Sequence, residues 1–420
     1  MIISLLLILT TLLTDTTHTE AFVGGGYGAS TYALEGKQYG GFTIAARSVY
    51  DISAKHRVFG EASYSWNQSK DNRFVENADY ELLYPYLTCD TVGGGLKSER
   101  YAFRGGYRML TEHVLWHLAL QFRAEQSYRE VDPRPKNKVT DLSLDGSVGY
   151  VDSRYAYSLV AGVGRYKQTN EIKFYSELGE SMIYHLVQPG ADYVRFAGKQ
   201  KEAYYHGYHV GGSLQVLPKA AGWMASAGYE FTAVTKELHD NTYIPIGRLR
   251  THDISALLGY YTAHWHATLS GGVMLRRGTQ YIYGSAENNY YHLLSKRANY
   301  AENRFYLSLD GLYVMALPFG QLVWHPTLTG VAGLTAEGGP TASGSPQGSL
   351  KWGDRSAVTR FSELGDLLTD SHVAARLGIR YQFPLRGKFG WFIEPSADYT
   401  HYTKTTRHTW QVALITGLYF

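Results

Sequence analysis

The sequence predicts an all-β protein whose strands form one antiparallel up-and-down sheet that closes into a transmembrane barrel. Three observations support this prediction. Apolar and polar residues alternate with a period of two through the whole chain, whereas helical periodicity is nearly absent. Short and long connections follow one another between the alternating stretches. The composition is rich in Tyr (36), Gly (45) and Trp (8) and poor in Pro (12), and Tyr and Trp favour membrane interfaces.

Alternating stretches bounded by turn residues give about sixteen strands, with about fourteen as the alternative count. A soluble β protein such as a propeller is the competing fold, but the chain shows no blade-like repeat. The predicted strands lie at residues 22–33, 38–52, 57–68, 99–110, 113–128, 140–152, 155–168, 203–217, 222–236, 250–263, 265–278, 303–316, 321–334, 371–384, 389–402 and 408–420.

The connections alternate in length along the chain. In an outer-membrane barrel the tight turns lie on the periplasmic side and the long loops lie outside, and an even strand count leaves both termini periplasmic. Short turns are expected at residues 53–56, 111–112, 153–154, 218–221, 264, 318–320 and 385–388. Long loops are expected at residues 69–98, 129–139, 169–202, 237–249, 279–302 and 335–370.

The N-terminus is expected to carry an export signal at residues 1–21, followed by a single barrel domain at 22–420. The apolar core Ile2–Leu13 is too short to span a bilayer, and Thr19-Glu20-Ala21 is a small-residue cleavage site. No Lys or Arg precedes this core, which leaves the true start of the chain open.

Each predicted strand has a charged face and an apolar face. In lipid every backbone N–H and C=O must be bonded within the protein, so strands are stable there only in a closed sheet. A basic side chain at mid-bilayer costs roughly 2–4 kcal/mol, so the charged face is expected to line the lumen. The candidate lumen-lining residues are Arg104, Arg108, Arg123, Glu125, Asp141, Asp145, Arg276, Arg304, Asp310, Arg376, Arg380, Glu394 and Asp398, and Arg47, Glu61, Glu230 and His266 share this face.

Hairpin register predicts which of these charges face each other. Facing residues of an antiparallel hairpin have position numbers with a constant sum. Centring the hairpin of 371–384 and 389–402 on its turn places Arg376 opposite Asp398 and Arg380 opposite Glu394. The hairpin around 129–139 likewise places Arg123 near Asp145.

The predicted lumen allows two interpretations. The charges form a pore lining that selects polar solutes, or they form ion-pair ladders that hold the lumen shut. Sixteen strands leave a wide lumen unless a loop fills it. The best candidate for filling is 335–370, which contains Gly338-Gly339-Pro340 and Gly344-Ser345-Pro346 and is either an outer loop or a constriction folded inward.

Bulk charge and cysteine content exclude several functions. The net charge of +3 gives no reason to expect a nucleic-acid partner. The single cysteine, Cys89, excludes an internal disulfide and is interpreted as an incidental thiol. No cofactor or metal site is predicted, because the pair His264 and His266 lacks a third ligand. The expected surroundings are the lipid bilayer and lipopolysaccharide.

A barrel hydrolase is the least favoured hypothesis. His239-Asp240, Asp370-Ser371-His372 and the pair His264 and His266 are the nearest catalytic materials, but the sequence shows only adjacency. Catalysis needs a nucleophile or activated water, a base and an orienting partner within hydrogen-bond reach. The leading hypothesis is therefore not an enzyme but a passive channel or transporter of unknown solute. The second hypothesis is a structural barrel whose long loops bind a partner.

The last predicted strand, 408–420, places Trp410, Val412 and Leu414 on one face and ends on Phe420. It resembles the terminal strand of bacterial outer-membrane proteins. In that class the last strand closes the barrel and the assembly machinery reads its terminal aromatic residue. The resemblance implies that Phe420 is an assembly signal for the barrel-assembly machinery. We also expect 408–420 to pair with 22–33 and with 389–402.

Several motifs resemble a Bacteroidota outer-membrane β-barrel family of unknown function, and with the strand pattern the likeness covers roughly residues 22–420. The resemblance implies the outer membrane of a Gram-negative bacterium and brings no substrate or site residues. The most specific motif, Asp132-Pro133-Arg134-Pro135, lies in a predicted outer loop, where we prefer a rigid bend to a binding role. The other motifs are Tyr84-Pro85-Tyr86-Leu87, Asp90-Thr91-Val92-Gly93-Gly94, Glu99-Arg100-Tyr101, Gly105-Gly106-Tyr107-Arg108 and Asp141-Leu142-Ser143-Leu144.

Overall fold

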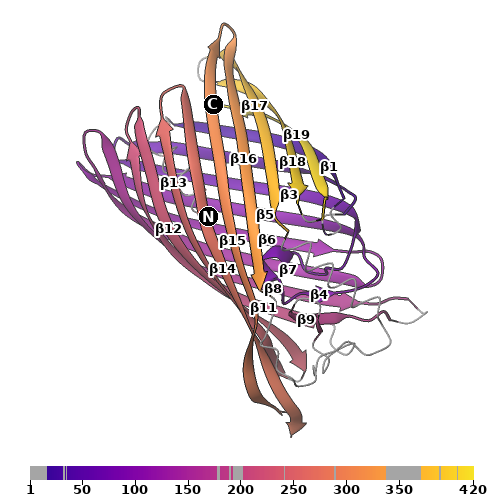
Figure 1. Cartoon of the computed structure of the whole chain (residues 1–420). Helices are drawn as coiled ribbons and strands as arrows, with labels where there is room; N and C mark the ends of the chain where they lie inside the picture. Colours follow the sequence, from indigo (N-terminus) through magenta and orange to yellow (C-terminus); the bar gives the residue numbers. More distant parts are fainter. Residues whose placement is uncertain are drawn as a thin grey trace.

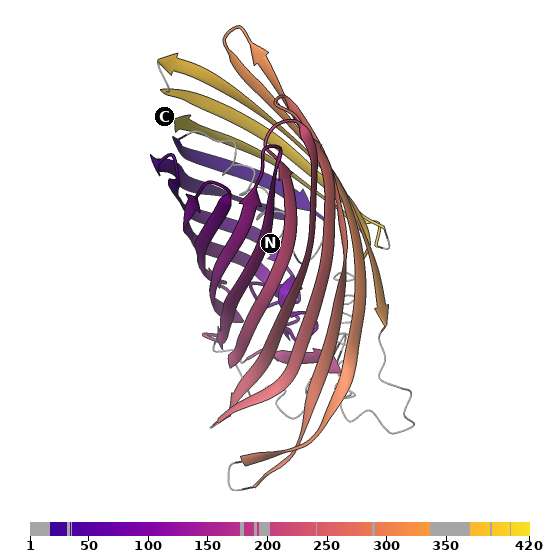
Figure 2. The same ribbon diagram turned by 90° about the vertical axis from the view of Figure 1, so that its left-hand side faces the viewer.

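The computed structural model describes residues 17–31, 34, 36–176, 180–188, 191–192, 202–240, 242–287, 290–336, 370–386, 389–403 and 405–420. Sixteen antiparallel strands form one closed barrel, which confirms the predicted fold class and strand count (Figures 1 and 2). These strands are β1 (His18–Ser30), β2 (Gln38–Ser53), β3 (His56–Asn72), β5 (Gly94–Leu110), β6 (Val114–Tyr128), β7 (Arg134–Val151), β8 (Tyr155–Lys173), β11 (Glu202–Pro218), β12 (Gly222–Asp240), β13 (Thr242–Tyr261), β14 (Trp265–Glu287), β15 (Tyr290–Leu317), β16 (Gly320–Ala336), β17 (His372–Arg386), β18 (Phe389–Tyr402) and β19 (His408–Tyr419).

The first and last strands close the barrel, as predicted. β19 pairs with β1 on one side and with β18 on the other. The Thr19 N–H donates to the Phe420 carbonyl at 2.7 Å, and the Phe420 N–H donates to the Thr19 carbonyl at 2.9 Å. The predicted signal-peptide boundary at Ala21 therefore falls inside β1, whose Glu20 carboxylate bonds to Arg47 and Arg380.

The outer surface of the barrel is apolar. Leu120 on β6, Leu159 on β8 and Leu309 on β15 are each at least half exposed on the face away from the lumen. Near the short turns the same face carries aromatic residues. Tyr313 is paired with Trp265 on one side and Trp324 on the other. An apolar band bounded by an aromatic girdle is typical of barrels that span a membrane. No helix among the described residues is long and apolar enough to cross a membrane.

Three predicted outer loops are wrong, because the hairpins continue past the barrel wall. β7 begins at Arg134 rather than near 140. β12 ends at Asp240, and β13 begins at Thr242. β14 ends at Glu287, and β15 begins at Tyr290. The inner faces of the extensions of β7 and β12 are buried, with Asn137 and Lys236 at most 1% exposed, so polar side chains there do not mark a solvated loop. The predicted loop or constriction at 335–370 lies almost wholly outside the described residues.

A fourth predicted outer loop turns inward instead. Residues 73–93, which we call the inner segment, include α2 (Tyr80–Leu83) and β4 (Thr88–Cys89). β4 pairs with β9 (Tyr184–Gln188), which pairs with β10 (Ala191–Asp192), in a small separate sheet. The hydrophobic core of the molecule joins this segment to the wall, with Leu87 and Tyr86 packed among buried residues of β12 to β15. The described lumen is therefore filled on one side by residues 73–93.

Candidate functional site

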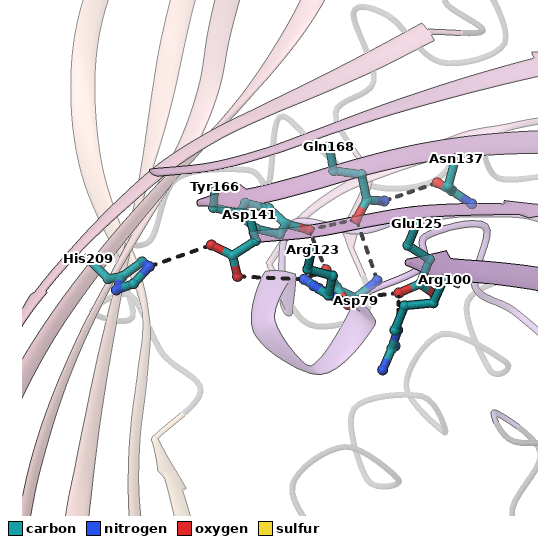
Figure 3. Close-up of polar contacts among 9 residues, drawn as sticks. All are labelled: Asp79, Arg100, Arg123, Glu125, Asn137, Asp141, Tyr166, Gln168 and His209. Carbon is teal, nitrogen blue, oxygen red and sulfur yellow. Dashed lines mark hydrogen bonds and ion pairs between the residues drawn. The ribbon is translucent and has the colours of Figure 1, made fainter. Parts of the chain in front are cut away.

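The lumen around the inner segment is the candidate site, and an ion pair at its centre anchors the segment. Asp79 precedes α2, and its carboxylate accepts two hydrogen bonds from Arg123 of β6, at 2.7 and 3.0 Å (Figure 3). Arg123 also lies 3.3 Å from Glu125 and 3.8 Å from Asp141. The Tyr166 hydroxyl is 2.9 Å from Asp79. A two-bond guanidinium–carboxylate contact fixes orientation as well as charge, so α2 is held in one position.

A second, fully buried group holds the two ends of the segment. Arg129, just after β6, donates through Nη1 to Glu76 at 3.1 Å and to Asp90 at 2.7 Å, and all three side chains are at most 1% exposed. The other Asp90 oxygen accepts from the backbone N–H groups of Val92 and Gly93. Gly93 has φ +76, and a Cβ there would overlap the Asn72 carbonyl, so this exit toward β5 requires glycine.

Amide side chains of β7 and β8 complete this anchor. The Glu76 carbonyl accepts hydrogen bonds from Asn137 at 2.7 Å and from Asn170 at 2.9 Å. Gln168 donates to Asn137 at 3.0 Å, and its own oxygen accepts from the Asp79 N–H at 3.4 Å. A buried backbone carbonyl without a partner is costly, so these amides favour the inward path of the chain.

β12 and β14 bind the inner segment by donating hydrogen bonds to the segment's backbone carbonyl groups. The buried Lys236 ammonium of β12 donates to the Leu87 carbonyl at 2.6 Å. Arg276 of β14 donates to the carbonyls of Glu81 and Leu82, each at 2.8 Å, and also lies 3.3 Å from Glu302. Cationic donors from two sides of the barrel therefore meet in the inner segment, which shows that it spans the lumen between β6 and β14.

Beyond the segment, toward the short turns, lies a polar cavity of about 440 Å³. Its wall follows one row of directly paired inward residues across seven strands. The smallest members of this row are Ser143 and Gly164, the row begins with the charged pair Glu61 and Arg104, and it ends with His209 and Thr232. The row is Glu61, Arg104, Gln121, Ser143, Gly164, His209 and Thr232.

One glycine gives the cavity its shape. A Cβ at Gly164 would overlap the His209 imidazole, so the ring lies over the bare backbone of β8. There His209 Nε2 is 3.5 Å from Asp141. Arg104, in contrast, forms no ion pair within the described part of the chain, although Glu61 and Asp145 are its acidic neighbours. Acidic and basic groups are therefore interleaved along the cavity wall.

A second lumen cavity of about 490 Å³ lies against another part of the wall. Its wall is formed by β19, β1, β2, β3 and β5, whose inward side chains here are small or uncharged, such as Gly24, Gly26, Thr43 and Asn67. Between the two cavities stands Arg100, which is 47% exposed and donates to Glu125 at 2.8 Å. The two cavities thus adjoin along β3 and β5, on the side of the lumen away from the anchors on β8 to β15.

The predicted register of the hairpin β17–β18 is confirmed, and the predicted register of the hairpin β6–β7 is wrong. Arg376 faces Asp398 with an ion pair at 3.5 Å, and Arg380 lies 3.9 Å from Glu394. Arg123, however, faces Asp141 rather than Asp145. The sum shifts by four because the last facing pair of β6 and β7 is Tyr128 and Lys136, so the loop between paired residues spans 129–135, not 129–139.

The other predicted lumen charges lie in separate groups along the wall. Arg304 binds Glu302 at 2.7 Å, beside Arg276. Asp310 accepts from Thr327 and lies 2.9 Å from His325. Arg108 is buried near Arg57 on β3. The sequence reasoning missed Glu76, Asp79, Asp90, Lys236 and Glu302. Four of these five residues lie in predicted outer loops, at 69–98 and 279–302, where charges are normally solvated, so no signal in the sequence indicated them.

The predicted hydrolase materials do not form a catalytic arrangement in the described residues. Ser371 accepts from the Gly333 N–H, and His372 Nδ1 lies 3.5 Å from the Asp370 backbone carbonyl, without a Ser371–His372 contact. His239 packs against Tyr204 and Tyr243. The described residues also contain no group of three His, Cys, Asp or Glu side chains arranged for a metal ion.

These features define a class: a β-barrel of the outer-membrane type whose lumen is partly occupied by a segment of its own chain. The sequence matches the model of the family of unknown function DUF6850 over residues 7–332. This match covers more than half of the chain, and the protein belongs to that family. No curated protein matches the sequence.

Solved structures that match the barrel have low similarity. CdiB from Acinetobacter baumannii is 8% identical, with 96% of this chain and 60% of that chain covered and a TM-score of 0.42. A Pseudomonas aeruginosa FadL homologue is 8% identical, with 96% and 90% covered and a TM-score of 0.41. The Pseudomonas putida toluene transporter TodX is 8% identical, with 97% and 91% covered and a TM-score of 0.37. Similarities of this size assign no function.

Proposed function

We propose that the protein is a passive channel in the outer membrane of a Gram-negative bacterium, and that it transports rather than catalyses. The observation that carries this proposal is the pair of lumen cavities, of about 490 and 440 Å³, whose linings include neighbouring stretches of β3 and β5. In the proposed orientation the termini and short turns are periplasmic. The export signal is then removed ahead of β1, because Glu20 bonds to Arg47 and Arg380 in the folded barrel.

The route that we propose passes the inner segment on the side of β19, β1, β2 and β3. Anchors to the segment come from β6 to β8 and from β11 to β15, whereas glycines and small polar residues line the opposite wall. The route then reaches the charged cavity past Arg100. In this proposal the predicted lumen charges Arg104, Arg123 and Asp141 line the route where it passes through the 440 Å³ cavity.

The solutes we propose are small, neutral and rich in hydroxyl groups. The cavity of about 440 Å³, which we call the lower cavity, presents three acids, Glu61, Asp141 and Glu230, and three bases, Arg104, Arg123 and His209. They are interleaved along the wall instead of forming separate positive and negative poles, so the cavity offers little to an ion or a zwitterion. Donors and acceptors are both abundant, and such a wall hydrogen-bonds hydroxyl groups without a net charge to balance.

Three solutes of nearly equal size test this proposal: glucose, gluconate and glucosamine. Purified protein in liposomes should admit glucose faster than either charged relative, and planar bilayers should show a small stable conductance. The variant Gln121→Trp fills the lower cavity and should abolish glucose entry. Leu120→Trp places the same side chain on the lipid-facing side of the same strand and should leave entry unchanged. A barrel without current and without glucose entry would end the channel hypothesis.

A second candidate function, binding of an extracellular partner, rests on one observation. β14 beyond Gln280 and β15 before Ala301 have no partner strand except each other among the described residues. They form a ribbon that projects past the barrel rim (Figures 1 and 2). Tyr290 and Leu294 on it are 66% and 68% exposed. Open strand edges accept an extended peptide. Absence of current both before and after removal of the inner segment would favour this function.

The remaining identity that we propose is an origin in the Bacteroidota, with lipopolysaccharide around the barrel and Phe420 as the residue read by the assembly machinery. The exposed Phe420 side chain, stacked near Phe389 at the end with the short turns, supports the last point. Its test is argued in the Discussion.

A further inference from the structure

Four exposed cations gather on the outside of the barrel, away from the lumen. Arg165 and Lys167 lie on β8, Arg250 on β13 and Arg277 on β14. On β8 the intervening Tyr166 points into the lumen, so Arg165 and Lys167 share the outer face with apolar side chains nearer the short turn. Arg250 and Arg277 are directly paired across the ladder. We call these four residues the exterior patch.

The height of the exterior patch matches the edge of the bilayer. Arg165 and Arg250 lie ten and eleven residues from the short-turn ends of their strands. With a rise of about 3.3 Å per residue and a strand tilt of about 40°, this places them roughly 25 Å above those turns, which is the height of the apolar band of such barrels. At a similar position along β3 and β19 the outer face carries Trp66 and Trp410 instead.

The cations of the patch have no acidic partners. Arg165, Lys167 and Arg250 form no hydrogen bond or ion pair within the described ranges. Arg250 faces Arg277, and like charges directly opposite on a ladder repel each other. Arg277 cannot turn away freely, because its guanidinium donates to the Glu302 carbonyl and the Asn303 side chain. An anion between the two arginines would remove this repulsion.

We propose that the exterior patch binds the phosphate groups of lipids in the outer leaflet. The apolar surface below it lies where acyl chains pack, so a bound lipid places its charged headgroup at the level of the patch. Guanidinium groups bind phosphate through paired N–H donors, which suits three of the four residues. Two strands, β11 and β12, stand between the cations of β8 and the arginines of β13 and β14, so the patch offers two phosphate positions. This proposal is independent of whether the lumen conducts.

Binding of diphosphoryl lipid A and of its dephosphorylated form to the full-length protein in detergent tests the proposal. The patch variant is Arg165→Gln, Lys167→Gln and Arg250→Gln, all residues without protein partners, so the fold should persist. The control variant is Lys55→Gln, Arg154→Gln and Lys219→Gln, which removes three cations from the short turns at the other end. Native mass spectrometry counts the lipid that each protein retains.

The wild type and the control should bind the phosphorylated lipid at least tenfold more tightly than the dephosphorylated one, and the preference should weaken with added salt. The patch variant should lose this preference and bind both lipids alike. A patch variant that keeps the wild-type preference would overturn the assignment of these residues. A wild type without any preference would overturn the site altogether.

Discussion

Arg129 is the single residue on which the inward path of the chain depends most. It is 1% exposed and faces the fully buried carboxylates of Glu76 and Asp90, one near each end of the inner segment. A buried ion pair adds little net stability over apolar packing, but removal of one partner leaves a charge buried without compensation. Arg129, Glu76 and Asp90 therefore hold the inner segment in place, and removal of one of them is costly. We call these three residues the latch.

The variant Arg129→Met tests this latch. Removal of the cation should destabilise the docked inner segment by about 3–5 kcal/mol, because two carboxylates lose their partner. Proteolysis within 73–93 and thermal unfolding in detergent measure the effect. Lys97→Met breaks an ion pair whose side chains are 28% and 64% exposed, and should cost less than about 1 kcal/mol. Equal proteolysis of the two variants would show that the latch has no role.

The Asp132-Pro133-Arg134-Pro135 motif also acts at the scale of single residues. Asp132 Oδ2 accepts from the backbone N–H groups of Tyr175 at 2.7 Å and Ser176 at 2.6 Å. The Arg134 guanidinium binds Asp132 and lies 4.5 Å from the Tyr175 ring centre. The motif therefore joins the turn between β6 and β7 to the chain that leaves β8, beyond the rigid bend expected from its prolines.

Acidification should release this junction. The hydrogen bond from the Tyr175 N–H, with the Arg134 contact, lowers the pKa of Asp132 below its ordinary value of about 3.9. A lowered folded pKa means that the junction is stabilised at neutral pH and loses this contribution as pH falls through the folded value. Amide protection factors at Tyr175 and Ser176 should stay constant from pH 7 to 5 and fall below about pH 4. Asp132→Asn should lower them at pH 7, and unchanged protection in that variant would contradict the prediction.

At the scale of elements, the sequence predicted those parts of the strands that separate lipid from lumen. Leu118 and Leu120 of β6 alternate with Ala119 and Gln121 because their two faces meet different solvents. Where β7 extends beyond the wall, its inner face carries the buried polar side chain of Asn137, so the apolar alternation stops at Lys136–Lys138 although the ladder continues. The short turn between β17 and β18 allowed the pairing of Arg376 with Asp398 to be predicted. The predicted loop at 129–139 was too long, so the partner of Arg123 was predicted wrongly.

The inner segment could not be predicted in this way. Residues 73–93 have neither alternation nor helical periodicity, and their polar side chains read as those of a solvated loop. Their partners come from β6, β7, β8, β12 and β14. Such contacts exist only once the barrel brings distant strands together. The charged lumen wall could therefore be predicted from the sequence, but the inner segment that binds this wall could not.

Replacement of residues 74–92 by a short Gly-Ser linker should open the lumen. The segment occupies the space between β6 and β14, and its removal joins the two cavities into a wider path. Single-channel conductance should rise severalfold over the wild type. A matched removal of 284–295 from the projecting ribbon should leave conductance unchanged, because the ribbon lies outside the wall. Equal conductance of wild type and linker variant would place the limiting constriction elsewhere.

At the scale of the whole molecule, closure of the barrel depends on β19. β19 forms two ladders, with β18 beside it in sequence and with β1 nearly four hundred residues earlier. Every other strand of the wall can pair before the chain is complete, but the barrel has open edges until β19 is in place. A signal at the end of this strand would therefore report that the chain is ready to close.

Deletion of Phe420 should slow assembly without weakening the finished barrel. In the folded protein Phe420 contributes one ring contact with Phe389 and two backbone hydrogen bonds to Thr19, and its side chain is 53% exposed. Few contacts are lost, so thermal unfolding of purified barrel should change little. If the assembly machinery reads this residue, the amount of heat-modifiable barrel in the outer membrane should fall severalfold. Phe420→Trp keeps a terminal aromatic and should restore it, whereas Phe420→Ser should not. Normal assembly of the Ser variant would contradict a role as assembly signal, and a matching loss of thermal stability would show that Phe420 acts through packing alone.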